Sequence, residues 1–300
     1  MTRRVGHFRS DEARGRFFEL YDRAVEELWP VPSEELDVDT SFGTTRVRRS
    51  GDGKGSPLVL VHGSSGTSVG WYTLVTPLAE HHQVLAVDVI GALGRSVQTR
   101  PVEGTEDLAV WFRELLDGLG IEHAHLIGYS EGGFVAFHAA LGNADRLATL
   151  VAIDAGGTVE RIKLRFWASL AWTILKVAVR VPNALRDFGQ RLTPGVEISE
   201  LQWDLMTTGA KGFRQALPMP RKVSDEHLRQ LTTPTMLYMA ANSEVYDASK
   251  AATRAQALMP DVEVVIVEGA QHGLPLTHPD RTWADIRQFI ARHEPRDQAP

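Results

Sequence analysis

Residues 128–133 read GYSEGG, which contains the pattern G-x-S-x-G with Ser130 at its centre. Residues 124–127 before this stretch are typical of a buried strand, and residues 134–141 after it favour a helix. A direct turn from a strand into a helix forces a sharp, strained bend at the serine. Gly128 and Gly132 relieve the crowding there because they lack a Cβ. We therefore predict an exposed nucleophile at Ser130 rather than an inert serine in an ordinary tight turn.

The composition of the chain excludes several classes of function. Of its 300 residues, 43% are apolar and 23% are charged, which is typical of a soluble globular protein. The net charge is −6 and no basic stripe is visible, so nucleic acid is not an expected partner. The absence of cysteine excludes disulfides, thiolate catalysis and cysteine-ligated zinc.

The N-terminus and the most apolar stretch bear on location. Residues 1–4 are basic, but charged residues follow them instead of an apolar core, so we expect no signal peptide and a solvated Arg3-Arg4 pair. Residues 166–181 are interrupted by Lys176 and Arg180 and are too short to span a bilayer comfortably. We therefore expect a cytoplasmic protein that does not cross a membrane.

Short apolar runs recur along the chain and are typical of strands buried on both faces of a parallel sheet. Helix-patterned segments separate them, for example residues 105–119. This alternation predicts an α/β fold with a mostly parallel central sheet flanked by helices. The predicted buried strands are residues 57–61, 84–87, 126–127, 150–153, 235–239 and 262–267, with an exposed strand at 44–49 and an N-terminal helix at 10–29.

Residues 158–230 break the alternation, because they contain no buried-strand pattern. They consist of helical pieces rich in Trp and Leu, separated by prolines. Placed after a strand that ends at Asp154, this segment projects from the carboxyl edge of the sheet, where Ser130 also lies. We expect a helical lid, with a separate helical domain as the alternative. The predicted organisation is residues 1–157 as the N-terminal helix and first part of the core, 158–230 as the lid, and 231–300 as the remainder of the core.

A serine hydroxyl is a weak nucleophile and needs a base within hydrogen-bond reach. Among the 11 histidines, His272 is favoured because it directly follows the predicted strand at 262–267. That position puts it on the same rim of the sheet as Ser130. Four others, at 81, 82, 123 and 125, are expected at the opposite rim, and His138 falls within a helix. His62 precedes Gly63 and is expected to shape its loop, while His278 precedes Pro279 and is expected to orient the next helix.

The third catalytic group must be a carboxylate that holds the imidazole in the correct tautomer. Glu244 and Asp247 both follow the predicted strand at 235–239. Asp247 precedes a helical run and is explained as its N-cap. Glu244 has no such local role and is therefore the preferred acid, while Asp154, at the end of an earlier strand, remains a further alternative.

An oxyanion formed by serine attack needs at least two N–H donors. The amide of Glu131 is one candidate, because it lies at the start of the helix that follows Ser130. The second is expected in residues 62–66, which read HGSSG, and Ser64 is the natural donor. The alternative for this loop is a Gly/Ser turn without a role in ligand binding.

Four motifs occur in an order and spacing that resemble the α/β-hydrolase superfamily, in particular its lid-bearing esterase-like branch. They are LVLVHG at 58–63 followed by Trp71, the stretch 88–96, GYSEGG, and AQHG at 270–273. The resemblance covers about residues 58–290 and implies the catalytic order Ser, acid, His. It also implies an acyl-enzyme mechanism on a carboxylic ester or related compound, with no cofactor and no metal. Family members commonly carry Asp in a G-E-x-D stretch at the acid position, whereas residues 241–244 read Ala-Asn-Ser-Glu.

The resemblance leaves the reaction open within the serine-using branch. Lactonases, thioesterases, C–C bond hydrolases, perhydrolases and lyases share the triad, and a ligand receptor without turnover is a further alternative. Epoxide hydrolases and haloalkane dehalogenases are disfavoured because they carry Asp at the position of Ser130. We expect a small, apolar acyl substrate, and the oligomeric state stays open. Six apolar residues of the lid either line the substrate pocket or only pack within the lid: Trp167, Leu170, Trp172, Ile174, Trp203 and Met206. Three arginines either hold a carboxylate of the substrate or are solvated at the surface: Arg165, Arg214 and Arg221.

Overall fold

The central feature of the fold is one large, mostly parallel β-sheet. The computed structural model describes residues 5–53 and 55–294, and within them nine strands form this sheet in the order β11-β10-β8-β7-β4-β5-β3-β2, with β6 paired to β3. The strands from β11 to β5 run parallel, and β3, β2 and β6 add an antiparallel edge. The predicted α/β sheet is therefore confirmed. The strands are β2 (Ser33–Thr40), β3 (Gly43–Ser50), β4 (Gly55–Val61), β5 (His82–Val87), β6 (Val97–Gln98), β7 (Ala124–Tyr129), β8 (Leu147–Ile153), β10 (Thr235–Ala240) and β11 (Val262–Val267).

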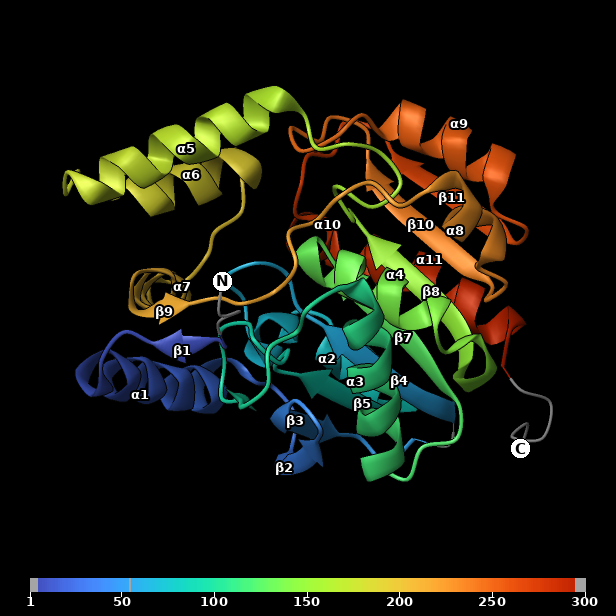
Figure 1. Cartoon of the computed structure of the whole chain (residues 1–300), viewed down its shortest axis with the longest axis horizontal. Helices are drawn as coiled ribbons and strands as arrows, with labels where there is room; N and C mark the ends of the chain where they lie inside the picture. The colour runs from blue at the N-terminus through green and yellow to red at the C-terminus, as the bar shows by residue number, and fades with distance from the viewer. Residues whose placement is uncertain (1–4, 54, 295–300) are drawn as a thin grey trace.

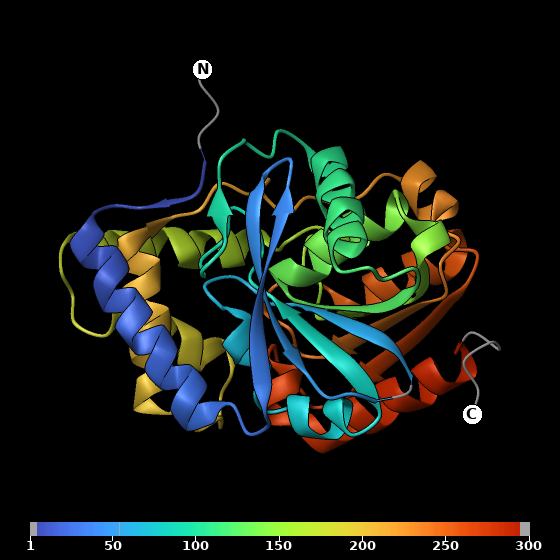
Figure 2. The same cartoon turned by 90° about the horizontal axis from the view of Figure 1, so that it is seen from below.

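Helices cover both faces of the sheet (Figures 1 and 2). One apolar core lies on each face. Side chains alternate along β4, so that Val59 and Val61 face the core beneath α3, α4 and α9, while Leu58 and Leu60 face the core beneath α2 and α11. Burial on both faces explains why this strand is a continuous apolar run. The helices of this part are η1 (Ser68–Trp71), α2 (Val75–Ala79), α3 (Thr105–Gly118), α4 (Glu131–Leu141), η2 (Ala144–Arg146), α9 (Ala248–Leu258), α10 (Leu274–Thr277) and α11 (Pro279–Arg292).

All seven predicted strands are present, but β2 and the two-residue strands were missed. The acidic residues of β2 alternate along an exposed edge, so this strand lacks the apolar run that marks a buried one. The predicted N-terminal helix is α1 (Asp11–Leu28), and Ser10 is its N-cap, with Oγ accepting from the amide of Ala13 at 3.1 Å.

Four helices lie between β8 and β10, in the segment where helical pieces were predicted. Figure 1 shows α5 and α6 above the sheet edge and α7 beside α1. Apolar side chains of α1 pack on α7, for example Phe17 and Tyr21 near Leu205, and β1 pairs with β9. The N-terminal segment therefore braces this insertion, a contact that the sequence did not predict. The elements are α5 (Leu164–Ala178), α6 (Ala184–Leu192), α7 (Glu200–Gly212), α8 (Asp225–Gln230), β1 (His7–Phe8) and β9 (Phe213–Arg214).

The structure bears on the expectation about membrane spans, whereas the basic N-terminal pair lies outside the residues it describes. Within residues 5–53 and 55–294, none of the helices combines the length and the apolar character that crossing a membrane requires. The apolar stretch singled out in the sequence contains most of α5, which has only 15 residues. The basic pair Arg3-Arg4 lies outside the described residues.

Candidate active site

Ser130 occupies a one-residue turn between a strand and a helix. β7 ends at Tyr129 and α4 begins at Glu131, and Ser130 between them has φ 54° and ψ −118°. A positive φ is strained for a residue with a Cβ. The amide of Ser130 donates to the carbonyl of Ile153 at 2.9 Å, which ties the turn to the neighbouring strand β8. The predicted sharp bend at the serine is therefore present.

Two glycines make this turn sterically possible. A Cβ on Gly132 would lie 2.2 Å from the carbonyl oxygen of Val61 and 2.3 Å from that of His62. A Cβ on Gly128 would lie 2.4 Å from the carbonyl oxygen of Gly132. The obstructing atoms belong to the backbone, so no side-chain rotation can relieve the clash. The helix and the strand therefore approach closely only because both residues are glycine.

We expect Gly132→Ala to lower the free energy of unfolding by roughly 2 kcal/mol or more, because the added methyl overlaps the backbone of β4 and its loop. The matched control is Gly15→Ala in α1, where an added Cβ meets nothing within 4 Å. That change should raise the free energy of unfolding by about 1 kcal/mol through helix propensity. Urea unfolding of both variants measures this, and equal effects at the two positions would contradict the steric argument.

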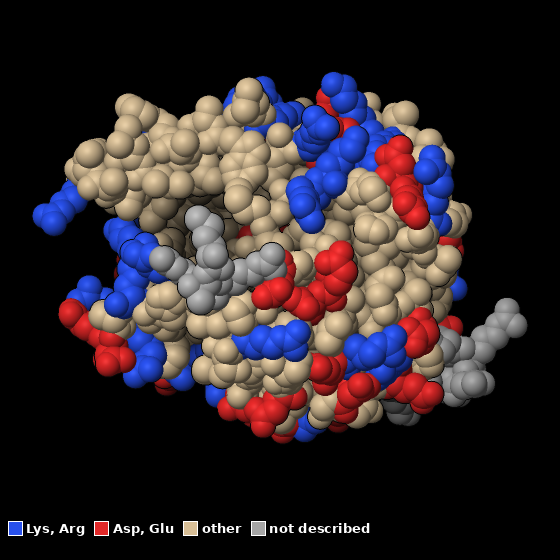
Figure 3. Space-filling view, viewed as in Figure 1, with Lys and Arg blue, Asp and Glu red and all other residues tan. Residues whose placement is uncertain are grey.

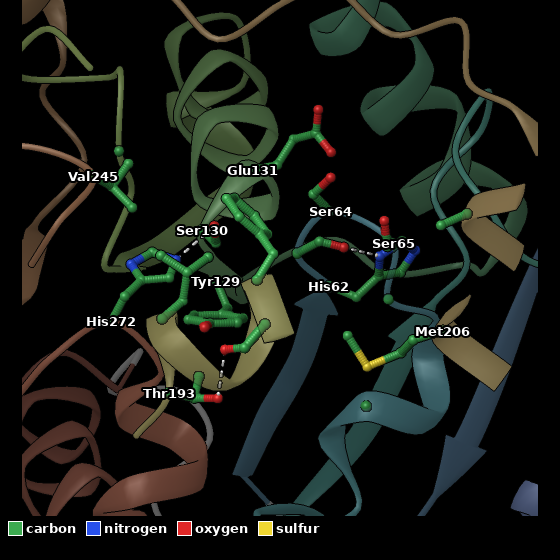
Figure 4. A pocket seen from close by; sticks show the side chains of 18 of the residues that line it. His62, Ser64, Ser65, Tyr129, Ser130, Glu131, Thr193, Met206, Val245 and His272 are labelled. Carbon is green, nitrogen blue, oxygen red and sulfur yellow. Dashed lines mark hydrogen bonds between the residues drawn. The ribbon is translucent and has the colours of Figure 1, made fainter. Parts of the chain in front are cut away.

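His272 lies directly beside Ser130. Its Nε2 is 3.0 Å from Ser130 Oγ (Figure 4), although 142 residues separate the two in the chain. The histidine follows β11 in the loop before α10, and the residue is only 5% exposed. The structure thus brings the predicted nucleophile and base within hydrogen-bond reach of each other.

Asp154 is the carboxylate that faces the other ring nitrogen of His272. Its Oδ2 lies 3.7 Å from His272 Nδ1, which is beyond hydrogen-bond length but within ion-pair distance. Asp154 is fully buried, and its Oδ1 accepts from the amide of Ala240 at 2.9 Å and from the Tyr246 hydroxyl at 3.0 Å. Among the described residues, His272 Nδ1 has no hydrogen-bond partner.

The prediction that Glu244 holds His272 is wrong. Glu244 pairs instead with Arg191 of α6, with Oε2 3.4 Å from Nε, and its side chain is 40% exposed. The physical reason is the path of the loops, since Asp154 directly follows β8 and stays at the buried sheet edge, whereas Glu244 lies farther along the loop after β10. The alternative Asp247 is the N-cap of α9, as expected, with Oδ1 accepting from the amide of Lys250 at 3.1 Å.

Burial sets the charge states of His272 and Asp154. Loss of solvent lowers the pKa of His272, and the nearby charge of Asp154 raises it by a smaller amount. Burial raises the pKa of Asp154, while the nearby His272 and the hydrogen bonds to the carboxylate lower it. The imidazole is therefore neutral around pH 7 and able to accept a proton.

The loop after β4 carries Ser64, the residue predicted as the second oxyanion donor, and His62 shapes this loop. His62 Nδ1 lies 2.9 Å from the carbonyl oxygen of Gly63, and Nε2 accepts from the amide of Val89 at 3.2 Å. Since a carbonyl can only accept, the Nδ1 atom carries the proton and the ring is neutral. Ser64 and Glu131 both line the cavity that contains Ser130.

A cavity of about 470 Å³ lies between the sheet edge and the helical insertion, and its hollow is visible in Figure 3. Four of the six apolar insertion residues suggested by the sequence line it. The other two, Trp172 and Ile174, are each 58% exposed and do not line it. None of the three candidate arginines for a substrate carboxylate lines it. The four insertion residues that line the cavity are Trp167, Leu170, Trp203 and Met206. The three arginines that do not line it are Arg165, Arg214 and Arg221.

The sequence missed two polar residues of the site. Tyr246, from the loop after β10, donates to Asp154, and Gln215, from the insertion, donates from Nε2 to the Glu131 carboxylate at 2.8 Å. Position after a strand could have suggested Tyr246, but no local pattern marks Gln215. Within residues 5–53 and 55–294, no group of three or more His, Asp or Glu side chains is placed to hold a metal ion.

The comparison with known protein families agrees with this geometry. Residues 58–285 match the model of the alpha/beta hydrolase family, so the match spans more than half of the chain. This chain belongs to the alpha/beta hydrolase family. Among similar proteins, carboxylesterase YbfK of Bacillus subtilis is 30% identical over 292 residues, which cover 94% of this chain and 96% of the relative.

Solved structures of this alpha/beta hydrolase family give the same result. Naproxen esterase (carboxylesterase NP) from Bacillus subtilis superposes with a TM-score of 0.86 at 26% identity, covering 94% of this chain and 99% of that structure. Carboxylesterase CesB (YbfK) from the same organism superposes with a TM-score of 0.84 at 25% identity, with the same coverage. The similarity therefore includes the helical insertion as well as the sheet.

Proposed function

We propose that this chain is a serine-dependent hydrolase of carboxylic esters. The observation that carries the proposal is the 3.0 Å contact between Ser130 Oγ and His272 Nε2 at a strained strand-to-helix turn that opens into an apolar cavity. The carboxylesterase relatives named above support an ester as the substrate. No cofactor enters the mechanism.

In the proposed reaction, Ser130 Oγ attacks the ester carbonyl carbon while His272 Nε2 takes the hydroxyl proton. The negative charge that develops on the carbonyl oxygen is held by the amides of Ser64 and Glu131. The C–O bond to the alcohol then breaks, and His272 returns the proton to the departing alkoxide. Water attacks the resulting acyl-serine with His272 again as the base, which releases the acid and restores Ser130.

Asp154 takes the role of the third triad member in this proposal. Its carboxylate faces Nδ1, so it favours the tautomer in which Nε2 is free to accept the serine proton. It also stabilises the imidazolium formed after that transfer. The amide of Ala240 and the Tyr246 hydroxyl both donate to the other carboxylate oxygen, which keeps Asp154 from rotating.

The cavity wall supports an apolar group on the substrate. Phe166 and Trp167 of α5, Phe188 of α6 and Trp203 of α7 all contribute to this wall. We propose that residues 158–230 act as a lid over Ser130, inserted between core segments 1–157 and 231–300, and that closing it excludes water. The cytoplasmic location and the possible homo-oligomer stay predictions.

A panel of acyl esters of graded chain length, run beside a lactone and a thioester, tests the proposed function. Ester turnover should exceed turnover of the other two, and an apolar acyl chain should raise kcat/KM until the cavity is filled. A serine-directed fluorophosphonate should label the protein once, at Ser130. Labelling at another serine, or ester turnover that is no faster with the protein present, would refute the proposal.

Activity should rise with pH through one ionisation that lies below the ordinary histidine value of about 6.5. The sign follows from the site, because turnover needs the neutral imidazole and burial lowers the pKa of His272. A pH profile of kcat/KM measures this acid limb, which is the rise of activity with pH. His272→Ala should remove the acid limb together with turnover. In the control His278→Gln the limb should stay in place, and a limb centred above pH 7 in the wild type would argue for a different base.

A further inference from the structure

The cavity contains one carboxylate that the proposed mechanism uses only through its backbone. Glu131 lines the cavity, and among the described lining residues it is the single acidic one. No lysine or arginine in the described part of the chain lines this cavity. Glu131 therefore places an acidic group at the wall of a mostly apolar cavity, and no lysine or arginine of that wall accompanies it.

The partners of this carboxylate are neutral. Gln215 Nε2 donates to it at 2.8 Å, and Ser64 lies beside it. Figure 4 shows Glu131 beside Ser64 above the Ser130 turn. Burial raises the pKa of Glu131, and the contacts with Gln215 and Ser64 lower it by less. A carboxylate in such surroundings is stabilised when an opposite charge enters the cavity, because the wall supplies none.

The cavity walls also suit an organic cation. Aromatic rings attract alkylammonium groups through their faces, and four of them come from the insertion, on Phe166, Trp167, Phe188 and Trp203. The arrangement of one carboxylate and several aromatic rings satisfies both the charge and the apolar surface of such a group. A substrate carboxylate, in contrast, would meet the charge of Glu131 without a compensating arginine.

We propose that Glu131 forms a subsite for a cationic alkylammonium group, so that the enzyme selects esters that carry such a group on their alcohol or acyl part. The inference rests on the proposed ester hydrolysis at Ser130. Since the amides of Glu131 and Ser64 hold the carbonyl oxygen in that mechanism, the bound ester lies against the residue that carries this carboxylate. Glu131 is thus a specificity-determining residue of the same site.

Two pairs of isosteric esters test the subsite. Butyrylcholine is compared with neohexyl butyrate, and the methyl ester of γ-butyrobetaine with its tert-butyl carbon isostere. Each pair differs in charge and hardly in shape, so the ratio of kcat/KM within a pair isolates the charge. Glu131→Gln keeps the size of the side chain and its hydrogen-bonding capacity. In at least one pair it should lower the cationic-to-neutral ratio by about tenfold or more.

The control variant is Glu226→Gln on the exposed surface of α8, which removes the same charge outside the cavity. Its ratios should match those of the wild type. If Glu131→Gln leaves the cationic-to-neutral ratio of kcat/KM unchanged in both pairs, the proposal is overturned. Equal losses on both members of each pair would also overturn it, and would assign Glu131 to positioning the Ser64 loop instead.

A binding measurement separates failure of the subsite from failure of the proposed function. Benzyltrimethylammonium should raise the melting temperature of the wild type and of Glu226→Gln, but not that of Glu131→Gln. If no ester of any kind is turned over, the proposed function fails. The shift in melting temperature then shows by itself whether Glu131 binds the alkylammonium group. Hydrolysis of the neutral esters without a Glu131-dependent effect of charge, in rate or in melting temperature, refutes only the subsite.

Discussion

Ser130→Ala is expected to reduce kcat by about 10⁶, as loss of the nucleophile does in a comparable triad. No other hydroxyl is hydrogen-bonded to His272 Nε2 among the described residues, so a replacement nucleophile is not at hand. The turn itself should survive, because alanine carries the same Cβ as serine in this strained conformation. The measurements are steady-state turnover of the best ester of the panel and the melting temperature of the variant.

The matched control for this change is Ser64→Ala in the facing loop. The proposed role of Ser64 resides in its backbone amide, which alanine retains, so the loss should be small compared with that at Ser130. Retention of a tenth of the wild-type rate by Ser130→Ala would refute the nucleophile assignment. A Ser64→Ala loss as large as that of Ser130→Ala would mean that the hydroxyl of Ser64 takes part in the chemistry.

Asp154→Asn should reduce kcat by about 10⁴, the cost of a carboxylate-to-amide change at the acid of a related triad. The amide removes the charge that stabilises the imidazolium, and its NH₂ group can favour the wrong tautomer of His272. The residual activity should also show its acid limb at lower pH, because the charge of Asp154 raises the pKa of His272. Folding should survive, since a neutral amide is easily buried and still accepts a hydrogen bond.

Glu244→Gln distinguishes the two candidate acids. It breaks only a partly exposed ion pair with Arg191, so stability should fall by about 0–1 kcal/mol and the rate should change little. Assays of kcat, its pH profile and the melting temperature on both variants decide between them. If Glu244→Gln has a lower kcat than Asp154→Asn, then Glu244, in the loop after β10, is the carboxylate that assists His272.

The sequence by itself determined the sheet and two members of the site. Apolar runs such as 57–61 mark strands that are buried on both faces, and this burial leaves a local pattern. Ser130 and His272 follow β7 and β11, and the carboxyl ends of parallel strands share one edge of the sheet. The position of each residue at the end of a strand was therefore enough to predict that the two meet.

Only the tertiary structure decided which carboxylate faces His272 and what surrounds Glu131. Asp154 and Glu244 both follow strands of that same edge, so they are equivalent by position in the chain. The path of each loop separates them, since it buries Asp154 beneath the imidazole and turns Glu244 outward to Arg191. The contact of Glu131 with Gln215, 84 residues away, likewise depends on how the insertion folds back over the sheet, which no local pattern encodes.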